Sequence, residues 1–441
     1  MEKLKSYLTE YTDARALGLL RIVIGSWFFI DLVSILIIGR VKLAYIDAQV
    51  NFPFYGFEWI QPLPAAGMYI LMGLLIIASV GITLGKFYRL SLISFIIGFG
   101  YIFMLDIPYT LNKFYLLLIL AFVLLFVPGD RTLSFRNKKH PEQAMSKVPR
   151  WTIFIFQFFF GFIYVLSGLS KINPDWLFHA QPLRTFFGNR SYFQVLDDQV
   201  FNVLVFAFSY GGMIFDLSII WLLRSKKTRL FGNLWQASFH ALNFFILGIG
   251  SLSIFAALMT WLLFPTKWLS KRVARLKLTE GAETTYRLPA YASGIFVIFL
   301  AVQLIVPFRH VIIPNNVNWT EKGHRFSWRL MTRTKSGSSS MFYVTDLKSG
   351  EVWPVYPMTY LTSRQYRKMS AETDLIIHFG HFLEKEWQSK GYDSVMVNAE
   401  VRTRLNGRPA GFLIDPELDL TKVSRSFLDD QHSLPPPERT E

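Results

Sequence analysis

A chain of 441 residues that is 52% hydrophobic and 17% aromatic, with a positive mean hydropathy, is typical of a membrane protein and not of a soluble one. Its net charge of +15 falls in short clusters between apolar segments, which favours loops facing anionic lipid over a nucleic-acid-binding surface. The absence of cysteine excludes disulfides, thiolate nucleophiles, iron–sulfur clusters and cysteine-ligated zinc.

Apolar segments near the length of a membrane-spanning helix recur along the first 308 residues. They are 16–38, 67–85, 88–105, 113–128, 151–170, 201–223, 231–249, 251–265 and 289–308, of which 113–128 and 251–265 are short. No small-residue cleavage site follows the first segment, so we expect it to be an uncleaved span. The expected fold is therefore a polytopic α-helical membrane domain over residues 1–308, with about nine spans.

Basic residues between these segments predict the topology. The clusters are Lys3, Lys5 and Arg15; Lys86 and Arg89; the loop 129–150; Arg224 to Arg229; and Lys267 to Lys277. With nine spans all these clusters fall on one side, which the positive-inside rule makes cytoplasmic. The loops 39–66, 106–112 and 171–200, and everything after residue 309, are then expected on the opposite side.

From Arg309 onward the pattern is typical of a small α+β domain, expected over 309–428 and outside the cytoplasm. Strands are expected at 326–334, 341–345, 351–356, 395–405 and 409–414, and an amphipathic helix at 371–389. Asn406-Gly407 predicts a hairpin between the last two strands. Residues 429–441, which contain Pro435-Pro436-Pro437, are expected to form a disordered tail.

One pattern in this domain resembles a metal site. Asp374, His378 and His381 share one face of the expected helix at metal-ligand spacing. Because the sequence offers no fourth ligand, a solvated face is the favoured interpretation, and no metal site is expected.

Polar residues inside apolar spans are functional candidates, because burying them in lipid is unfavourable. Arg21 lies close enough to the inner face to snorkel, so Asp31 is the residue of the first span that needs a partner. His240 and Asn243 are three residues apart and share one helix face. Such a pair either hydrogen-bonds a ligand or serves helix packing.

Lys171 ends the apolar run that begins at Trp151 and precedes Asn173-Pro174, where the helix should stop. It is therefore expected at the polar boundary of a span. One interpretation is a snorkelling lysine that marks the interface. The other is an amine held partly out of water that acts as a general base. The sequence leaves both open because it does not reveal whether the side chain is buried.

The stretch Ser167 to Trp176 resembles the lysine motif of the vitamin K-dependent γ-carboxylases and of bacterial proteins with the related horizontally transferred transmembrane domain. Further matches in the same order are Phe28 to Asp31, Tyr88-Arg89, Leu105-Asp106, Asn112, Gly211 to Asp216, Phe239 to Asn243, Asn318 to Thr320, Phe326 to Met331 and Asp415-Pro416. The resemblance covers about residues 13–420. It implies a bacterial inner-membrane protein whose active side faces away from the cytoplasm.

The resemblance also implies a coupled reaction. Lys171 would deprotonate a vitamin K hydroquinone, phylloquinol or menaquinol, which then reacts with O2. The strong base so formed would remove a glutamate γ-proton, CO2 would add, and the quinone would leave as its epoxide. The implied cofactor-binding residues are Asn112, Lys113, His240 and Asn243, and the implied substrate-binding residues are Trp319, Arg325 and Trp328. The implied partners are a glutamate-containing protein or peptide and the lipid bilayer, without nucleic acid.

Two departures from the animal carboxylases stand out. Lys113 occupies the position of a histidine, which puts the cofactor step in question, and the longer C-terminal region is absent, which makes propeptide-guided carboxylation less secure. The alternative function is a non-catalytic quinone- or lipid-binding integral membrane protein with the same fold. A transporter is disfavoured because no inverted repeat or paired broken helix is visible in the sequence.

Overall fold

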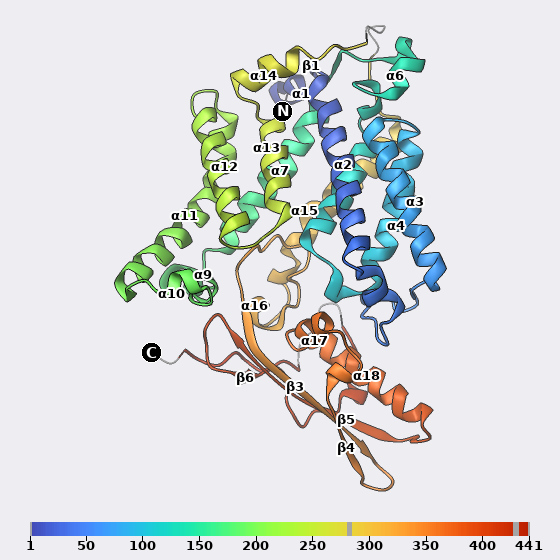
Figure 1. Cartoon of the computed structure of the whole chain (residues 1–441), viewed down its shortest axis with the longest axis vertical. Helices are drawn as coiled ribbons and strands as arrows, with labels where there is room; N and C mark the ends of the chain where they lie inside the picture. Colours follow the sequence, from blue (N-terminus) through green and yellow to red (C-terminus); the bar gives the residue numbers. More distant parts are fainter. Residues whose placement is uncertain (1, 280–284, 427–431, 440–441) are drawn as a thin grey trace.

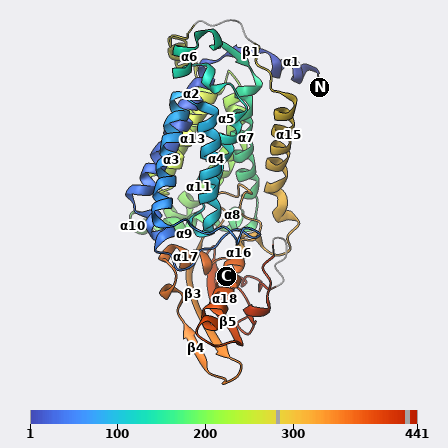
Figure 2. The same cartoon turned by 90° about the vertical axis from the view of Figure 1, so that its right-hand side faces the viewer.

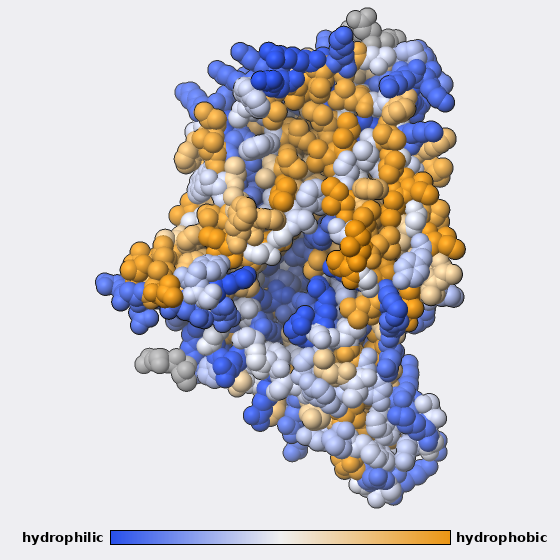
Figure 3. Space-filling view, in the orientation of Figure 1, coloured by the Kyte–Doolittle hydropathy of each residue, from blue (hydrophilic) through white to orange (hydrophobic). Residues whose placement is uncertain are grey.

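The apolar segments form helices that run side by side in one bundle, with a small sheet-containing domain at one end (Figures 1 and 2). The structure is a computed structural model that describes residues 2–279, 285–426 and 432–439. The bundle contains α2 (Arg15–Ile37), α3 (Ala65–Leu84), α4 (Tyr88–Leu105), α5 (Asn112–Leu125), α7 (Trp151–Ser170), α11 (Asp198–Arg224), α12 (Arg229–Phe245), α13 (Ser251–Leu263) and α15 (Ala290–Ile305). Apolar residues cover much of the visible side of the bundle, whereas the C-terminal domain and the end of the bundle opposite to it are more hydrophilic (Figure 3).

The expected count of nine membrane spans is not confirmed. Among the described residues, 6 helices are long and apolar enough to cross a membrane, or 7 if α13 and α14 (Lys267–Ala274), which are bent by 78°, form one span. The 14 residues of α5 extend only about 21 Å, less than the bilayer core of about 30 Å. The 17 residues of α12 also fall short, at about 26 Å.

The basic clusters gather at one end of the bundle. The short elements α1 (Glu2–Thr9), α6 (Phe135–Lys139) and α14, which carry three of them, lie at the end opposite the sheet (Figure 1). At the same end, β1 (Tyr11–Asp13) pairs with β2 (Lys147–Pro149). The chain is an integral membrane protein, and this arrangement agrees with a C-terminal domain on the side away from the basic clusters.

Cysteine labelling tests this topology, since the native chain has no cysteine. Ser339→Cys, on an exposed part of β3, should react with a membrane-impermeant maleimide added to intact cells. Lys139→Cys, in α6, should react only after the cells are permeabilised. Labelling of the Lys139 position alone in sealed cells would reverse the topology.

Arg21 does not snorkel, contrary to expectation. Its side chain is fully buried and its Nη2 donates a hydrogen bond to the Leu133 carbonyl at 2.6 Å. The loop that contains Leu133 folds over the inner end of α2, so the guanidinium meets protein before it reaches water.

The C-terminal domain is an antiparallel sheet of order β4-β3-β5-β6 with helices on one face. The strands are β3 (Lys335–Asp346), β4 (Val352–Val355), β5 (Val395–Leu405) and β6 (Gly411–Phe412), and the helices are α16 (Val317–Thr320), α17 (Ser363–Met369) and α18 (Thr373–Ser389). Alternate residues of β5, such as Val397 and Ala399, are buried in the same apolar core as α18. The predicted hairpin is confirmed, with Asn406 and Gly407 at φ +50° and +76° between β5 and β6.

The strand expected at 326–334 does not form. Phe326, Trp328 and Met331 have φ of +65°, +55° and +58°, which is left-handed backbone that a strand excludes. The aromatic residues that suggested a strand instead point into cavities next to the bundle. This segment is therefore a series of turns.

The expectation of a disordered tail is also wrong for residues 432–439. The Leu434 backbone N–H donates a hydrogen bond to the Leu413 carbonyl at 3.0 Å, just after β6, and the Leu434 carbonyl accepts a hydrogen bond from Trp319 Nε1 at 2.7 Å. Arg439 reaches Asp175 of the bundle at 3.0 Å. These contacts hold the segment against the domain, whereas 429–431, 440 and 441 lie outside the described residues.

The face of α18 that carries Asp374, His378 and His381 is half-buried and not fully solvated, because other side chains and backbone groups cover part of it. The Arg425 guanidinium pairs with Asp374 at 2.8 Å and contacts His378 Nδ1 at 3.1 Å. His381 Nε2 lies 2.8 Å from the Val423 carbonyl. A positively charged side chain therefore occupies the space that a metal ion would need.

Candidate active site

The site is built around Lys171, which follows the last residue of α7. Asn173 accepts a hydrogen bond from the Trp176 backbone and starts the next short helix, α8 (Pro174–His179), so α7 ends where Pro174 predicted. Lys171 is only 5% exposed. The snorkelling interpretation is therefore wrong, because the amine does not reach bulk water.

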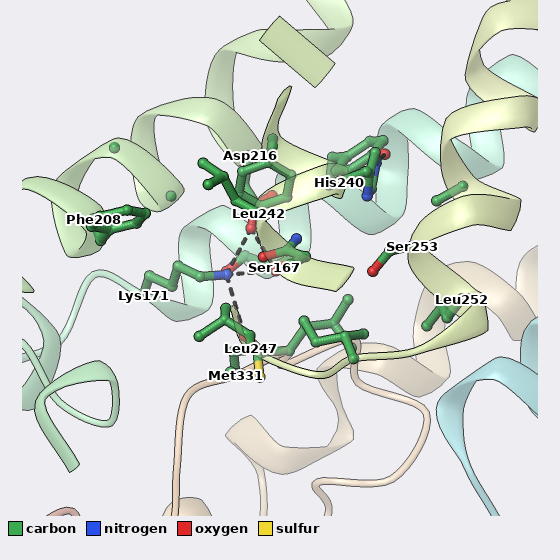
Figure 4. Close-up of a pocket in the computed structure, with 18 of the residues that line it drawn as sticks. Ser167, Lys171, Phe208, Asp216, His240, Leu242, Leu247, Leu252, Ser253 and Met331 are labelled. Atoms are coloured by element: carbon green, nitrogen blue, oxygen red, sulfur yellow. Dashed lines mark hydrogen bonds and ion pairs between the residues drawn. The ribbon is translucent and has the colours of Figure 1, made fainter. Parts of the chain in front are cut away.

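The Lys171 ammonium is surrounded by hydrogen-bond acceptors (Figure 4). Nζ lies 2.6 Å from Asp216 Oδ2 and 2.7 Å from Ser167 Oγ. It lies 3.2 Å from the carbonyl oxygens of both Ser167 and Leu330. An ammonium has three protons and no acceptor, so this arrangement matches the protonated amine. Lys171 can act as a base only after one of these protons has left.

Asp216 on α11 is a residue of the site that the sequence does not predict. It ends the Gly211 to Asp216 match to the family but is not among the predicted site residues. Its side chain and that of Lys171 are each only 6% exposed, and Ser167 Oγ donates to Asp216 Oδ2 at 2.7 Å. A carboxylate in an apolar span requires a partner, and this signal could have drawn attention to it.

The Lys171 amine borders a cavity of about 410 Å³, a size within the usual range for small-molecule sites. Side chains of α5, α7, α11, α12 and α13 line it, and most are apolar; examples are Phe160, Phe208, Phe239, Leu242, Ile246 and Leu252. The surface is hollowed at the junction of the bundle and the C-terminal domain (Figure 3). An apolar chamber with a few convergent polar groups suits a greasy ligand with a polar head.

His240 on α12 supplies one of these polar groups. Its Nε2 lies 2.9 Å from the Tyr164 hydroxyl on α7. Its Nδ1 is buried and has no hydrogen-bond partner within the described chain. Figure 4 shows the His240 ring beside the same chamber as Lys171, and Asn243 lines this chamber as well. An unpaired nitrogen in a buried ring favours a ligand contact, since it is unfavourable to leave it unpaired.

Asn112 and Lys113, at the start of α5, also line the chamber. Lys113 Nζ pairs with Asp31 Oδ1 at 2.8 Å, so the partner predicted for Asp31 exists. Asp106, at the start of the loop 106–112, has a structural role. Its carboxylate accepts hydrogen bonds from the Phe52 backbone and from Gln365, which joins the bundle to α17.

The C-terminal domain closes the cavity from outside. Trp328, Leu330 and Met331 line it, and Leu330 contacts Lys171 through its carbonyl. The other two expected substrate contacts lie elsewhere. Trp319 is 1% exposed in the core of the C-terminal domain. Arg325 lines a second cavity and pairs with Glu372. The structure thus gathers six of the eight predicted site residues, Lys171, Asn112, Lys113, His240, Asn243 and Trp328, around one chamber.

Asp175, in the lysine motif, fixes the two domains to each other. Arg408 binds both carboxylate oxygens at 2.7 Å, and Asn406 Nδ2 donates to Oδ2 at 2.8 Å. Burial alone would raise the pKa of Asp175, but the hydrogen bonds from Arg408, Asn406 and Arg439 outweigh burial and lower it. The carboxylate is therefore charged and anchors the sheet domain beside Lys171.

Comparison with known families agrees with this two-part design. Residues 10–268 match the HTTM domain, and residues 289–439 match the vitamin K-dependent gamma-carboxylase lumenal domain. No solved structure matches the chain. The first match contains the Lys171 cavity apart from its outer cover, and the second contains that cover and places the sheet domain on the non-cytoplasmic side. The chain belongs to the vitamin K-dependent gamma-carboxylase family.

Proposed function

We propose that this protein is a vitamin K hydroquinone-dependent γ-glutamyl carboxylase-like enzyme that couples hydroquinone epoxidation to glutamate carboxylation. The observation that carries the proposal is the buried Lys171–Asp216 pair at the wall of an apolar chamber. We further propose that it works in the inner membrane of a bacterium.

The residues of the chamber fit a quinol. Its apolar walls suit the ring and the isoprenoid tail, and the unpaired His240 Nδ1 together with Asn243 could hydrogen-bond a ring oxygen. Tyr164 bonds the other ring nitrogen of His240 and so holds the ring in position. When bound, a vitamin K hydroquinone reacting with O2 supplies the base that removes a carbon-bound γ-proton, a task beyond any side chain near neutral pH.

Lys171 would handle the proton of the hydroquinone. Its own proton first passes to Asp216 Oδ2, 2.6 Å away, and the neutral amine then accepts a proton from the substrate hydroxyl. Ser167 Oγ accepts a hydrogen bond from the amine and donates one to the carboxylate, so it holds the two groups next to each other. The low exposure of the pair keeps water from competing for the proton.

The glutamate side chain would enter from the non-cytoplasmic side, beside Trp328 and Met331, which line the chamber on that side. Lys113 stands where the animal enzymes have a histidine, and its ion pair with Asp31 places an ammonium group at the wall of the chamber. We propose that Lys113 orients the polar head of the quinol and takes no proton from it.

The decisive experiment uses purified protein in detergent with reduced vitamin K, labelled bicarbonate and a glutamate-containing peptide. We expect labelled peptide and quinone epoxide to appear together, in proportion. Quinone binding with neither product would instead support the non-catalytic quinone-binding alternative. Epoxide without labelled peptide would mean that only the oxidative half-reaction operates.

A binding measurement tests the polar contacts of the quinol. Replacing both His240 and Asn243 with leucine should weaken quinone binding about ten- to hundredfold, because each hydrogen bond inside a membrane protein contributes about 1 kcal/mol. Ser94→Leu, on the exposed face of α4, is the matched control and should leave the affinity unchanged. Unaltered affinity in a folded double variant would identify both residues as packing residues.

A further inference from the structure

The chamber contains a polar group that has no role in the proposed reaction, the Ser253 hydroxyl on α13. Ser253 lines the chamber and is only 3% exposed, and its Oγ has no hydrogen-bond partner among the described residues. Within that part of the chain, two of the residues that line the chamber carry a buried side-chain atom without a partner: His240 at Nδ1 and Ser253 at Oγ. His240 is already placed beside the quinol, whereas Ser253 is not.

The backbone before Ser253 explains why its hydroxyl is unpaired. Serine and threonine hydroxyls inside helices often donate to the carbonyl of the residue four positions earlier, as Thr260 of the same helix does to Ala256 at 2.6 Å. Ser253 is the third residue of α13, and Ile249, four positions earlier, lies before the helix and beyond Gly250 at φ +73°. The carbonyl that would accept this hydrogen bond is therefore not in its helical position, and the hydroxyl is left for a partner inside the chamber.

Ser253 and Lys171 face the chamber from different sides. In Figure 4 the Lys171 amine and the Ser253 hydroxyl lie on opposite sides of the view, and both point into the space between them. Leu252 and Ala256 of α13 also line the chamber, but their side chains are apolar. Ser253 is therefore the single polar side chain that α13, a helix described over its whole length, presents to a ligand.

A hydroquinone ring carries two oxygen atoms at opposite ends, which matches a chamber with Lys171 on one side and Ser253 on the other. We propose that Ser253 is a binding residue for the quinol and hydrogen-bonds the ring oxygen that is farther from Lys171. A serine hydroxyl can donate and accept, so it suits both the hydroxyl of the hydroquinone and the carbonyl of the quinone. The inference rests on the quinol binding of the proposed function and adds that the site recognises both ring oxygens.

Stability distinguishes a binding role of Ser253 from a structural one. A buried hydroxyl without a partner is unfavourable in the free protein, whereas alanine leaves no polar group unsatisfied and favours the helix. Ser253→Ala should therefore leave the midpoint of chemical unfolding unchanged or raise it, and should weaken binding of vitamin K quinone about three- to tenfold. Ser251→Ala, in the same turn but outside the lining of the chamber, is the control and should change neither quantity. A lower midpoint with unchanged affinity in Ser253→Ala would identify a structural serine.

Infrared spectra of the bound quinone test which oxygen Ser253 contacts, because a hydrogen bond lowers the stretching frequency of a carbonyl group. The wild type and the variants are compared with vitamin K quinone that carries carbon-13 at one ring carbonyl or at the other. Ser253→Ala should raise the frequency of one carbonyl band, and Lys171→Ala should change the frequency of the other. A shift of the same band in both variants, or of neither band in Ser253→Ala, would overturn the proposal.

Ligands that lack one ring oxygen give a second test, with the two vitamin K hydroquinone analogues in which one hydroxyl is replaced by hydrogen. Ser253→Ala should weaken binding of one analogue about three- to tenfold and leave the affinity for the other unchanged. Equal losses for both analogues would overturn the proposal. A wild type that binds vitamin K quinone as tightly as Ser253→Ala does would overturn this inference alone, whereas a wild type that binds no quinone would overturn the proposed function as well.

Discussion

Replacing Lys171 with alanine should abolish quinone epoxidation and glutamate carboxylation together, because the second step takes its base from the first. Loss of a general base typically lowers the rate about 10²- to 10⁴-fold, so both products should fall by this factor in the assay. Quinone binding should persist, since the walls of the chamber remain. Lys42→Ala, an exposed lysine away from the cavity, is the control and should retain full activity.

Lys171→Arg separates a base from a merely positive side chain. Arginine keeps the pairing with Asp216 but cannot release its proton near neutral pH, so this variant should be as inactive as the alanine variant. A small amine added to Lys171→Ala should restore part of the activity, and more of it as the pH rises. Near-normal turnover in Lys171→Arg would end the proposal that Lys171 is the base.

The position of Lys171 could be predicted because its signals are local. The apolar run from Trp151 and the Asn173-Pro174 pair specify where α7 ends, and both act within a few residues of the lysine. The paired strands and the Asn406-Gly407 hairpin follow from local periodicity and turn chemistry in the same way. The prediction that Lys171 and five other residues share one site came from the family resemblance, and all six line one chamber.

The partners of these residues could not be predicted, because they depend on distant packing. Asp216 lies 45 residues from Lys171, and Lys113 lies 82 residues from Asp31. Arg425, which pairs with Asp374 on α18, lies 51 residues from it in the sequence. Arg21 looked free to snorkel because nothing nearby in the sequence reveals that the Leu133 loop covers it.

The prediction of a strand at 326–334 is wrong for a different reason. The alternating aromatic residues of this segment have the composition of a strand, and left-handed backbone at three non-glycine positions leaves no mark in composition. Trp328 borders one cavity and Phe326 the other, so both rings pack beside the bundle instead of alternating along a strand. Local pattern and tertiary packing conflict here, and the backbone follows the packing.

The Lys171–Asp216 pair also predicts a large effect on stability. Both side chains are only 6% exposed, so Asp216→Leu leaves an unpaired buried ammonium and should lower the free energy of unfolding by about 3–5 kcal/mol. Chemical unfolding in detergent, with the change in tryptophan fluorescence as the readout, measures this loss. The control pair Lys348–Asp393, 67% and 79% exposed, should contribute no more than about 1 kcal/mol.

The double variant Lys171→Met, Asp216→Leu tests whether the ion pair serves folding or the reaction. Removing both charges relieves the desolvation of each, so its stability should return to within about 1 kcal/mol of the wild type or exceed it. It should nevertheless make neither epoxide nor carboxylated peptide. If the double variant is instead as unstable as Asp216→Leu alone, the pair is part of the structural core. Recovery of stability without recovery of turnover would mean that folding does not need these charges, and that the chain keeps an ion pair in an apolar chamber for its chemistry.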